Sequence, residues 1–372
     1  MNRPQRKPSE VSRQSHAPAP NATPYALGYR MPAEWDRHEA TWLAWPHEIT
    51  DWPGKFAPIL WVYAEIVRHL ARVERVRILV EDRDAEARAR GALKKAHADL
   101  AAVEFIRVPT DRGWIRDFGP IFVKNEKNGE VAATHWLFNA WAKYDNFTKD
   151  SVAFTHANRH LKHRVWQPHH RGRRAVLEGG SIDVNGRGTL LTTEECLLST
   201  VQARNPGVAR EDLEKIFRDN LGATHVVWLK NGIAGDDTHG HVDDLARFVN
   251  RATVVTVVEE DRSDVNHEPL QENLALLQTV REEDRQPLRV ETLPMPAPVF
   301  FAGQRLPASY ANFYIANKIV LVPTFNDPND LIALNKLSSL FPGREVVGIA
   351  CRDLVLGLGT IHCMTQQEPA RS

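Results

Sequence analysis

Short apolar runs alternate with amphipathic segments along most of the chain. Runs rich in β-branched residues predict strands, and apolar positions at helical spacing, as in residues 59–70, predict helices. The predicted strands are Val76–Val80, Val103–Val108, Ala175–Val184, Thr189–Leu198, His225–Leu229, Thr253–Val258, Leu288–Leu293, Lys318–Val322 and Glu345–Ile349. The predicted helices lie in 59–70 and at Asp84–Leu100, Val208–Asn220, Glu268–Glu283 and Pro328–Leu340. This alternation is typical of α/β proteins.

The N-terminal segment differs in composition from the rest of the chain. Residues 1–24 are rich in Pro, Ser, Arg and Asn and hold almost nothing to bury, so we expect a disordered tail. Between residues 25 and 369 no stretch has the composition of a convincing linker. We therefore expect one domain over residues 25–369.

Charge and cysteine content narrow the class of protein. The 372 residues include 47 Lys and Arg and 47 Asp and Glu, which gives no reason to expect a nucleic-acid partner. No apolar run is long enough for a membrane span, and the N-terminus lacks the apolar core of a signal peptide. Cys196, Cys351 and Cys363 form no CxxC pair, which fits a reducing compartment. These features predict a cytoplasmic protein without a membrane partner, with Cys196 and Cys351 in the core.

The sequence around one cysteine suggests a catalytic function for its thiol. Cys363 lies in Leu354–Glu368, where an apolar, strand-like run and the glycines Gly357 and Gly359 precede it. Glycines give the backbone the freedom to turn closely around a ligand. The alternative is a buried thiol that serves only as a small apolar side chain.

Two acidic residues stand beside glycine turns. Asp117 follows an apolar-aromatic run and precedes the turn Gly119–Pro120, while Glu178 precedes two glycines in the segment LEGGS. A surface ion pair between Arg116 and Asp117, and a solvated turn or helix cap at Glu178, are the alternatives. Neither carboxylate identifies a reaction by itself.

The segment Gly235–Asp244 holds the densest group of titratable side chains. If it is extended, His239, His241 and Asp243 share one face, because side chains of a strand alternate. Such a face would suit a zinc or iron ion. A catalytic base beside a carboxylate is the second interpretation, and a polar loop is the third.

His362 is adjacent to the cysteine, but we do not expect it to act as the base. In an extended Ile361–Met364, the side chains of His362 and Cys363 would point to opposite faces. The histidine that serves the thiol must then come from elsewhere in the sequence, and His241 is the natural candidate.

A thiol, a histidine and several carboxylates together suit one class of substrate. A thiolate with a histidine indicates nucleophilic catalysis, and carboxylates buried without a cationic partner would be costly, so we expect the site to receive a cation. A planar guanidinium offers parallel N–H donors to paired carboxylates and presents its central carbon to a thiolate. The residues therefore predict a guanidine-hydrolysing site.

The chain also resembles the agmatine deiminase family, in the group that includes bacterial peptidylarginine deiminases and other guanidino-modifying enzymes. The resemblance covers nearly the whole expected domain. The motifs that carry it are Gly28–Trp35, Thr41–Pro46, Trp114–Pro120, Leu177–Leu198, Arg204–Pro206, Gly240–Asp244, Tyr310–Asn317 and Ile361–Gln367. It implies a five-bladed α/β propeller, the pentein fold, built from pseudo-repeated ββαβ units with the site on the central axis.

The resemblance implies a role for each candidate residue. Cys363 resembles the family nucleophile, His241 the general acid and base, and Glu178 the carboxylate paired with that histidine. Asp117 and Asp243 resemble the two carboxylates that hold the guanidinium. The implied reaction converts agmatine to N-carbamoylputrescine and ammonia through a covalent thiouronium on the cysteine, and it needs neither a metal nor an organic cofactor.

Two departures from the family bear on the substrate rather than on the chemistry. Gly357–Thr360 reads GLGT where the family has Gly-Gly-Gly-Asn, and Trp45–Phe56 also differs from the segment typical of agmatine enzymes. Peptidyl-arginine, free arginine or another alkyl guanidine is therefore the alternative substrate. Among the aromatic residues, Trp114 is expected to stack on the substrate, while Trp141 and Tyr144 fit either the pocket or the core.

Two further alternatives use the same residues differently. A metal-dependent hydrolase would use His239, His241 and Asp243, and a non-catalytic relative would bind a guanidine without releasing ammonia. The expected partner is a small cationic guanidino compound. By analogy with the family, we also expect a homodimer or a higher homo-oligomer.

Overall fold

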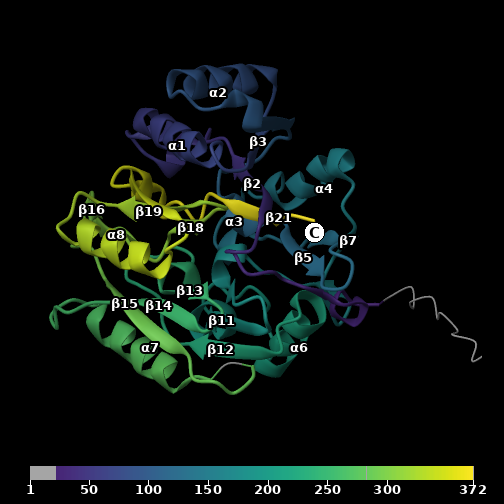
Figure 1. Ribbon diagram of the computed structural model, residues 1–372, viewed down its shortest axis with the longest axis vertical. Coiled ribbons are helices and arrows are strands. Elements are labelled where there is room, and N and C mark those ends of the chain that lie inside the picture. The colour runs from purple at the N-terminus through teal and green to yellow at the C-terminus, as the bar shows by residue number, and fades with distance from the viewer. Residues whose placement is uncertain (1–21, 282, 372) are drawn as a thin grey trace, which may run out of the picture.

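The computed structural model describes residues 22–281 and 283–371 (Figure 1). Most of the predicted disordered tail, residues 1–21, lies outside the described residues. Within the described part, the helices lie around the outside and most strands lie toward the centre (Figure 1). The predicted α/β architecture is confirmed.

Some of the helices begin or end at residues with recognisable capping chemistry. The α-helices are α1 (Phe56–Leu70), α2 (Arg83–Lys95), α3 (Ile115–Phe118), α4 (Asp150–Leu161), α5 (Glu194–Leu198), α6 (Arg210–Leu221), α7 (His267–Thr279) and α8 (Asn329–Leu340). The 3₁₀-helices are η1 (Tyr25–Leu27), η2 (Ile49–Asp51), η3 (Leu100–Ala102), η4 (Ala140–Ala142), η5 (Gly179–Ser181), η6 (Val242–Asp244) and η7 (Leu354–Gly357). The Asp82 side chain caps α2 by accepting from the Ala85 amide, and α6 ends at the left-handed Gly222.

The sheets repeat one pairing scheme. In each, an antiparallel pair is followed by a parallel pair whose strands are joined through a helix, as parallel neighbours require. The sheets are β1 (Tyr29–Arg30), β5 (Ile121–Asn125), β6 (Val131–Thr134) and β7 (Val165–Trp166); β10 (Asp183–Val184), β11 (Thr189–Thr193) and β12 (His225–Leu229); β13 (Ala246–Asn250), β14 (Thr253–Val258) and β15 (Arg289–Pro294); β18 (Tyr314–Ile315), β19 (Ile319–Thr324) and β20 (Glu345–Ala350); and β21 (Gln366–Pro369), β2 (His38–Ala44), β3 (Arg75–Val80) and β4 (Val103–Arg107).

Two short hairpins complete the described strands. They are β8 (His169–His170) with β9 (Arg173–Arg174), and β16 (Phe300–Phe301) with β17 (Gln304–Arg305). The C-terminal strand β21 pairs antiparallel with β2, with Thr41 opposite Gln367. This pairing brings the segment after Cys363 back to the N-terminal sheet.

Three predicted strands are wrong in part. Within the predicted strand Ala175–Val184 the chain forms η5, so that only Asp183–Val184 belongs to a named strand, β10, and Val176 forms an isolated bridge with Leu137. The predicted strand Thr189–Leu198 ends at Thr193, whose hydroxyl caps α5 by accepting from the Cys196 amide. The apolar run at Leu354 is η7 rather than a strand. Strands β2, β5, β6 and β13 and helix α4 were not predicted.

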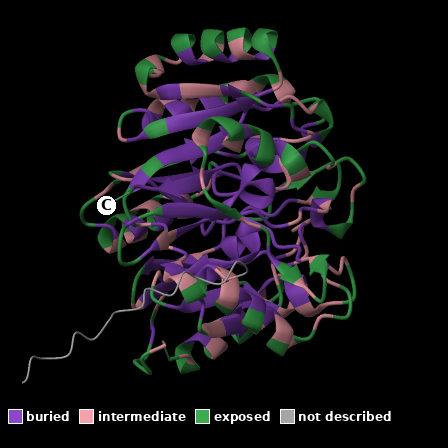
Figure 2. Ribbon diagram, turned by 90° about the vertical axis from the view of Figure 1, so that its right-hand side faces the viewer, coloured by how far each residue is buried: buried purple, intermediate pink, exposed green. Residues whose placement is uncertain are grey.

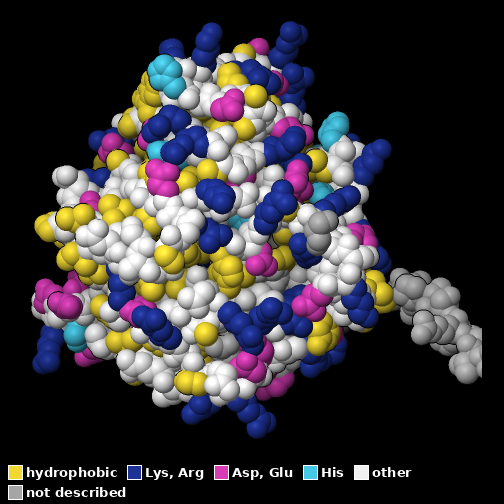
Figure 3. All heavy atoms as spheres, viewed as in Figure 1, with side chains coloured by type: hydrophobic (Ala, Val, Ile, Leu, Met, Phe, Trp, Pro, Cys, Tyr) yellow, Lys and Arg dark blue, Asp and Glu magenta, His cyan; other side chains and the backbone are white. Residues whose placement is uncertain are grey.

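The core lies among the sheets and beneath the helices. Figure 2 shows buried residues along the central strands, and the helices expose one side. Cys196 and Cys351 are fully buried in the core, as predicted, but Cys196 also lies next to the charged side chains of Glu178 and His241. The face in Figure 3 intersperses basic and acidic side chains. In the described part of the chain, no helix has the length and apolar character needed to cross a membrane.

Candidate active site

Cys363 lies in a turn at residues 361–364, between η7 and β21. The Thr365 hydroxyl closes this turn by donating to the Ile361 carbonyl at 2.9 Å, so the predicted extended conformation is wrong. The backbone carbonyl of Cys363 accepts from the Arg116 amide at 3.2 Å, which fixes the turn against α3. The thiol is therefore positioned by a closed turn and by a contact to a distant helix.

His362 is not available as a base for the thiol, although the extended geometry behind that prediction is wrong. Its Nδ1 lies 2.6 Å from Oδ2 of Asp243, and its Nε2 lies 2.8 Å from Oε2 of Glu34. Both ring nitrogens are thus engaged by buried carboxylates. His362 instead orients Asp243, because it fixes one carboxylate oxygen and leaves the other free.

All five predicted site residues converge on one point. Asp117 lies in α3, Glu178 and His241 stand immediately before η5 and η6, and Asp243 lies within η6. Nδ1 of His241 is 3.8 Å from Oδ1 of Asp117 and 4.0 Å from Oδ1 of Asp243. Nε2 of His241 is 3.9 Å from Oε2 of Glu178. Sγ of Cys363 is 3.8 Å from Oδ2 of Asp243.

Gly180 permits this convergence. A Cβ atom at this position would lie 2.6 Å from Nδ1 of His241 and 2.9 Å from Oδ1 of Asp117. Its amide also donates to Oδ1 of Asp117 at 3.1 Å. A larger residue would push the histidine and the carboxylate away, which explains the glycine that the sequence places here.

The carboxyl of Asp117 and the imidazole of His241 influence each other's protonation. Burial raises the pKa of Asp117 to about 6, helped by the charges of Asp243 and Glu178 and opposed by His241. Burial alone would lower the pKa of His241, but Asp117, with Cys196 and Glu178, raises it well above its ordinary value. The histidine is therefore held as the cation and has a proton to donate.

Glu178 is stabilised as the anion by a buried arginine. Burial alone would raise the pKa of Glu178, but Arg204 and His241 lower it to about 2. Nε of Arg204 donates to Oε1 of Glu178 at 3.0 Å, and both side chains are fully buried. The role of Arg204 was missed in the sequence, although its motif Arg204–Pro206 is part of the resemblance to deiminases.

The thiol of Cys363 is disfavoured as the thiolate. Burial raises its pKa well above the ordinary value, and the charges of Asp243, Asp244 and Asp117 add to this effect. The Asn312 side-chain amide opposes them by donating to Sγ at 3.2 Å. A cation bound among the carboxylates would shift the same balance toward the thiolate.

Several polar atoms of this cluster have no hydrogen-bond partner. They are both ring nitrogens of His241, Oε2 of Glu178 and Oδ1 of Asp243, all buried. Buried polar groups are normally satisfied, so unpartnered ones indicate a ligand or a catalytic function. The unpartnered Oδ1 of Asp243 can accept a hydrogen bond from an N–H group of a planar cation.

A buried network of hydrogen bonds holds the residues at the floor of the site. Glu34 accepts hydrogen bonds from Arg247 at 2.9 Å and from Arg116 at 3.4 Å. Arg116 is 2% exposed and donates to Gln367 at 2.7 Å, so its predicted surface ion pair with Asp117 is wrong. The roles of Glu34, Arg247 and Asn312 were missed, because only the fold brings these residues to the site.

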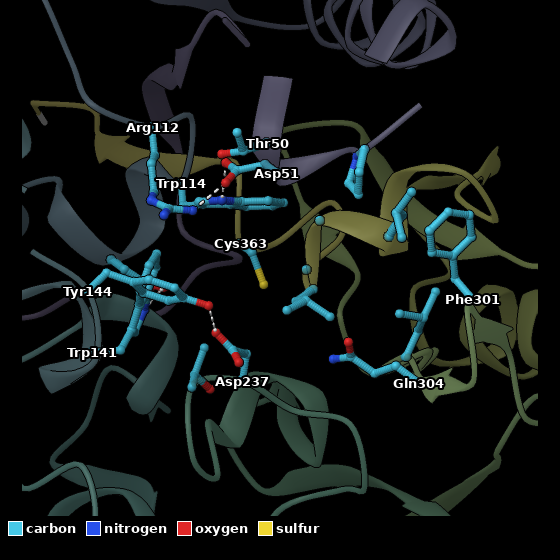
Figure 4. A pocket seen from close by; sticks show the side chains of 18 of the residues that line it. Thr50, Asp51, Arg112, Trp114, Trp141, Tyr144, Asp237, Phe301, Gln304 and Cys363 are labelled. Carbon is cyan, nitrogen blue, oxygen red and sulfur yellow. Dashed lines mark hydrogen bonds and ion pairs between the residues drawn. The ribbon is translucent and has the colours of Figure 1, made fainter. Parts of the chain in front are cut away.

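A cavity of about 410 Å³ opens above the thiol (Figure 4). Cys363 and Asp117 are among the residues that line it, and directly behind them Asp243 lies 3.8 Å from Sγ of Cys363 and His241 lies 3.8 Å from Asp117. The other lining residues are Thr50, Asp51, Pro53, Arg112, Trp114, Trp141, Tyr144, Asp237, Thr238, Phe301, Ala302, Gln304, Leu306, Leu356, Gly357, Leu358 and Gly359.

The aromatic residues of the cavity are held by carboxylates. The Trp114 indole donates to Asp51 at 3.1 Å, and the Trp141 indole donates to Asp117 at 2.9 Å. The Tyr144 hydroxyl donates to Asp237 at 2.6 Å (Figure 4). Trp114 lines the cavity beside Cys363, where the sequence predicted it, and Trp141 and Tyr144 also belong to the pocket.

The predicted metal-binding face is wrong. His239 has a positive φ of 65° and Gly240 one of 92°, so the segment is not extended. Nε2 of His239 bonds to the Ser199 hydroxyl at 3.1 Å, away from His241. Within the described ranges, Glu178, Cys196 and His241 are the group with metal-ligand spacing, which is a different set of side chains.

The buried pair of Arg204 and Glu178 gives a stability prediction. We expect Arg204→Ala to lower the free energy of unfolding by about 3–5 kcal/mol, because it leaves an unpaired buried carboxylate. Arg171→Ala is the matched control: Arg171 pairs with Asp212 at the surface, where such pairs contribute at most about 1 kcal/mol. Urea denaturation measures both. Equal losses in the two variants would contradict the buried-pair argument.

The chain is similar to known proteins over most of its length. The sequence model of the family described as Porphyromonas-type peptidyl-arginine deiminase matches residues 30–369. An agmatine deiminase of Pseudomonas aeruginosa is 35% identical over 94% of this chain and 98% of its own. A solved agmatine deiminase of Enterococcus faecalis superposes with a TM-score of 0.86 at 30% identity, over 95% and 99% of the two chains. A solved cysteine-to-serine variant of C. jejuni agmatine deiminase with substrate bound gives 0.81 at 29% identity, over 92% and 97%.

Proposed function

The chain belongs to the Porphyromonas-type peptidyl-arginine deiminase family, and from this premise we propose that it hydrolyses agmatine to N-carbamoylputrescine and ammonia. The observation that carries this proposal is the convergence of Asp117, Glu178, His241 and Asp243 on Cys363, with acceptor atoms left unpartnered.

We propose that residues 25–369 form one catalytic domain with the five-bladed propeller arrangement. The repeated sheet pairing, with a helix crossing between the parallel strands of each sheet, supports this arrangement. The site then lies where the five units meet, so its residues come from distant parts of the sequence. The predicted homo-oligomer stays a prediction.

In the proposed complex, Asp117 and Asp243 hold the guanidinium by its N–H donors. The planar cation suits paired carboxylates, because each can accept two parallel hydrogen bonds. Its charge lowers the pKa of the Cys363 thiol, which the free site keeps high. The bound substrate thereby activates the nucleophile that attacks it.

The first half of the reaction forms the covalent intermediate. With the cation bound, the Cys363 thiol loses its proton to solvent, and the thiolate Sγ bonds to the guanidinium carbon to give a tetrahedral adduct. His241, held as the cation, donates a proton to one NH₂ group, and the C–N bond breaks to release ammonia. An alkyl thiouronium remains on the cysteine. Glu178 stabilises the protonated histidine and keeps its Nε2 side oriented, so that Nδ1 faces the reacting groups.

The second half releases the product. His241, now neutral, takes a proton from a water molecule, which attacks the thiouronium carbon. The C–S bond then breaks, the thiolate of Cys363 is restored, and the hydroxyl proton of the adduct passes to solvent as the ureido compound leaves. Atoms and charge balance as guanidinium-form agmatine plus water giving N-carbamoylputrescine plus ammonium, because the released ammonia takes up that proton.

The direct test measures both products. Purified protein with agmatine should release one ammonia for each N-carbamoylputrescine formed, with ammonia measured by a coupled assay and the ureido compound by mass spectrometry. Release of urea and putrescine instead would contradict deimination. Binding of agmatine without release of ammonia would support the non-catalytic alternative.

One observation favours arginine as a second candidate substrate. Arg112 lines the cavity, and its buried Nε has no hydrogen-bond partner, so it could pair with a substrate carboxylate. However, its guanidinium already pairs with Asp51 and with Asn146, and a carboxylate would compete with Asp51. We therefore rank agmatine first. Values of kcat/KM for agmatine, arginine and an arginine-containing peptide decide between them.

The raised pKa of Asp117 predicts an acid limit to activity. Asp117 must be ionised to hold the cation, and its pKa lies at about 6 rather than near 4. Because protonation removes the charge, kcat/KM for agmatine is expected to fall about tenfold per unit below about pH 6. Initial rates between pH 5 and 8 measure this acidic fall in kcat/KM. A value of kcat/KM that stays constant down to pH 5 would contradict the assignment.

A further inference from the structure

Leu358 has a backbone conformation that is costly for its side chain. Its φ of 65° and ψ of 24° lie in the left-handed region, which glycine occupies freely and a branched residue does not. Leu358 also lines the cavity together with Cys363. Strained residues of this kind persist where their surroundings fix them, and they cluster at ligand sites.

Large apolar side chains at positive φ are confined to this cavity within the described ranges. They are Trp141 and Leu358, and both line it. The other non-glycine positions with positive φ are His97, Ala140, Ala142, Lys162, Arg171, Gln202, His239, Arg285, Ala302 and Asn326. Trp141 is held by its hydrogen bond to Asp117, but Leu358 has only apolar atoms in its side chain. A side-chain hydrogen bond therefore does not explain why leucine occupies position 358.

The flanking glycines show how closely this loop approaches the thiol. A Cβ atom at Gly359 would lie 2.9 Å from the Trp114 ring and 3.1 Å from Sγ of Cys363. A Cβ atom at Gly357 would lie 2.8 Å from Trp114. Steric contact with neighbouring atoms therefore leaves no room for a side chain at Gly357 or Gly359. Of residues 357–359, Leu358 is therefore the one that carries a side chain, and it lies at the wall of the cavity.

We propose that Leu358 is a specificity-determining residue that contacts the alkyl chain next to the guanidinium of the substrate. The proposal rests on the proposed function, which places the guanidinium carbon at Cys363. Leu356 and Leu306 continue the apolar lining, and Figure 4 shows Phe301 and Gln304 at a distance from Cys363 across the cavity. Such a wall favours guanidines with an unbranched methylene chain over guanidines that lack a chain.

The test compares two substrates in two variants. In Leu358→Ala and Leu358→Gly, kcat/KM for agmatine is expected to fall about tenfold, mainly through KM, because apolar contact with the chain is lost. With methylguanidine, which has no chain to contact, kcat/KM is expected to change by less than about twofold. Asn326→Gly is the control, since it also places glycine at a positive-φ position but lies outside the cavity, and it should keep wild-type kcat/KM for both substrates.

The unfolding temperatures of the two variants distinguish relief of backbone strain at residue 358 from loss of the contact with the substrate. Glycine relieves the strained backbone and alanine does not, so Leu358→Gly should unfold at a higher temperature than Leu358→Ala. Unchanged agmatine constants in both variants, or an equal loss with methylguanidine, would overturn the proposal while leaving agmatine hydrolysis intact. A wild-type protein that releases no ammonia from any alkyl guanidine would overturn the proposed function and this proposal together.

Discussion

Cys363→Ser is expected to lower kcat with agmatine by about 10⁴-fold or more, because the hydroxyl is a far weaker nucleophile in the same place. The site disfavours an anion at this position even for a thiol, whose pKa is raised by burial and by the charges of Asp243, Asp244 and Asp117. A serine hydroxyl, which ionises much less readily, would gain too little from the bound cation. Ammonia release at saturating agmatine measures the loss.

The control for this variant is another buried cysteine. Cys351 is fully buried in the core and lies outside the cavity, so Cys351→Ala should keep wild-type kcat within about twofold. A cationic amidine alkylating agent, which supplies the charge that favours the thiolate, should inactivate the wild type and the Cys351 variant alike, and agmatine should protect both. If Cys363→Ser turned over agmatine at the wild-type rate while remaining folded, Cys363 would not be the nucleophile.

The sequence predicted the site better than the local structure around it. Asp117, Glu178, His241 and Asp243 each stand beside a turn, where polar residues cannot serve a sheet and glycines allow a close approach. That reasoning depends on residue type and spacing, and the structure brings these side chains together, while their catalytic roles stay a prediction. The resemblance then supplied roles that residue types alone left open.

The errors came from segments in which apolar pattern and local hydrogen bonds conflict. Thr189–Leu198 carries apolar residues on both sides of its polar centre, yet the Thr193 hydroxyl caps a helix and ends the strand. The segment containing His239 and His241 has strand-like alternation, but positive φ at His239 turns the chain. Periodicity detects burial and does not detect such a cap or turn.

The supporting residues could not be found by pattern because their function depends on the assembled fold. Glu34 stands more than three hundred positions from His362 in the sequence, yet their side chains lie 2.8 Å apart. Asn312 meets the thiol of Cys363 from the strand-rich C-terminal third. Both lie in motifs that carry the family resemblance, Gly28–Trp35 and Tyr310–Asn317, but a Glu or Asn within a motif does not indicate which side chain it contacts. These residues orient the catalytic groups and keep the carboxylates charged or neutral as required.

His241→Gln is expected to lower kcat with agmatine by about 10²–10⁴-fold, because both the departure of ammonia and the activation of water need a proton carrier. Both ring nitrogens of His241 lack hydrogen-bond partners in the free site, and neighbouring carboxylates keep the ring protonated. Glutamine keeps much of the volume but cannot transfer a proton. His239→Gln is the matched control and should retain activity, since His239 bonds to Ser199 away from the cluster.

A substrate with a better leaving group separates the two roles of His241. The S-methylisothiourea analogue of agmatine releases methanethiol without an acid, and attack by Cys363 gives the same thiouronium. The His241→Gln variant should then release about one methanethiol per protein molecule and stop, because water is no longer activated. Intact-protein mass spectrometry should detect the adduct on Cys363. Continuous turnover of the analogue by this variant would assign the water-activating step to another group, with Glu178 the nearest carboxylate to the vacated Nε2 position.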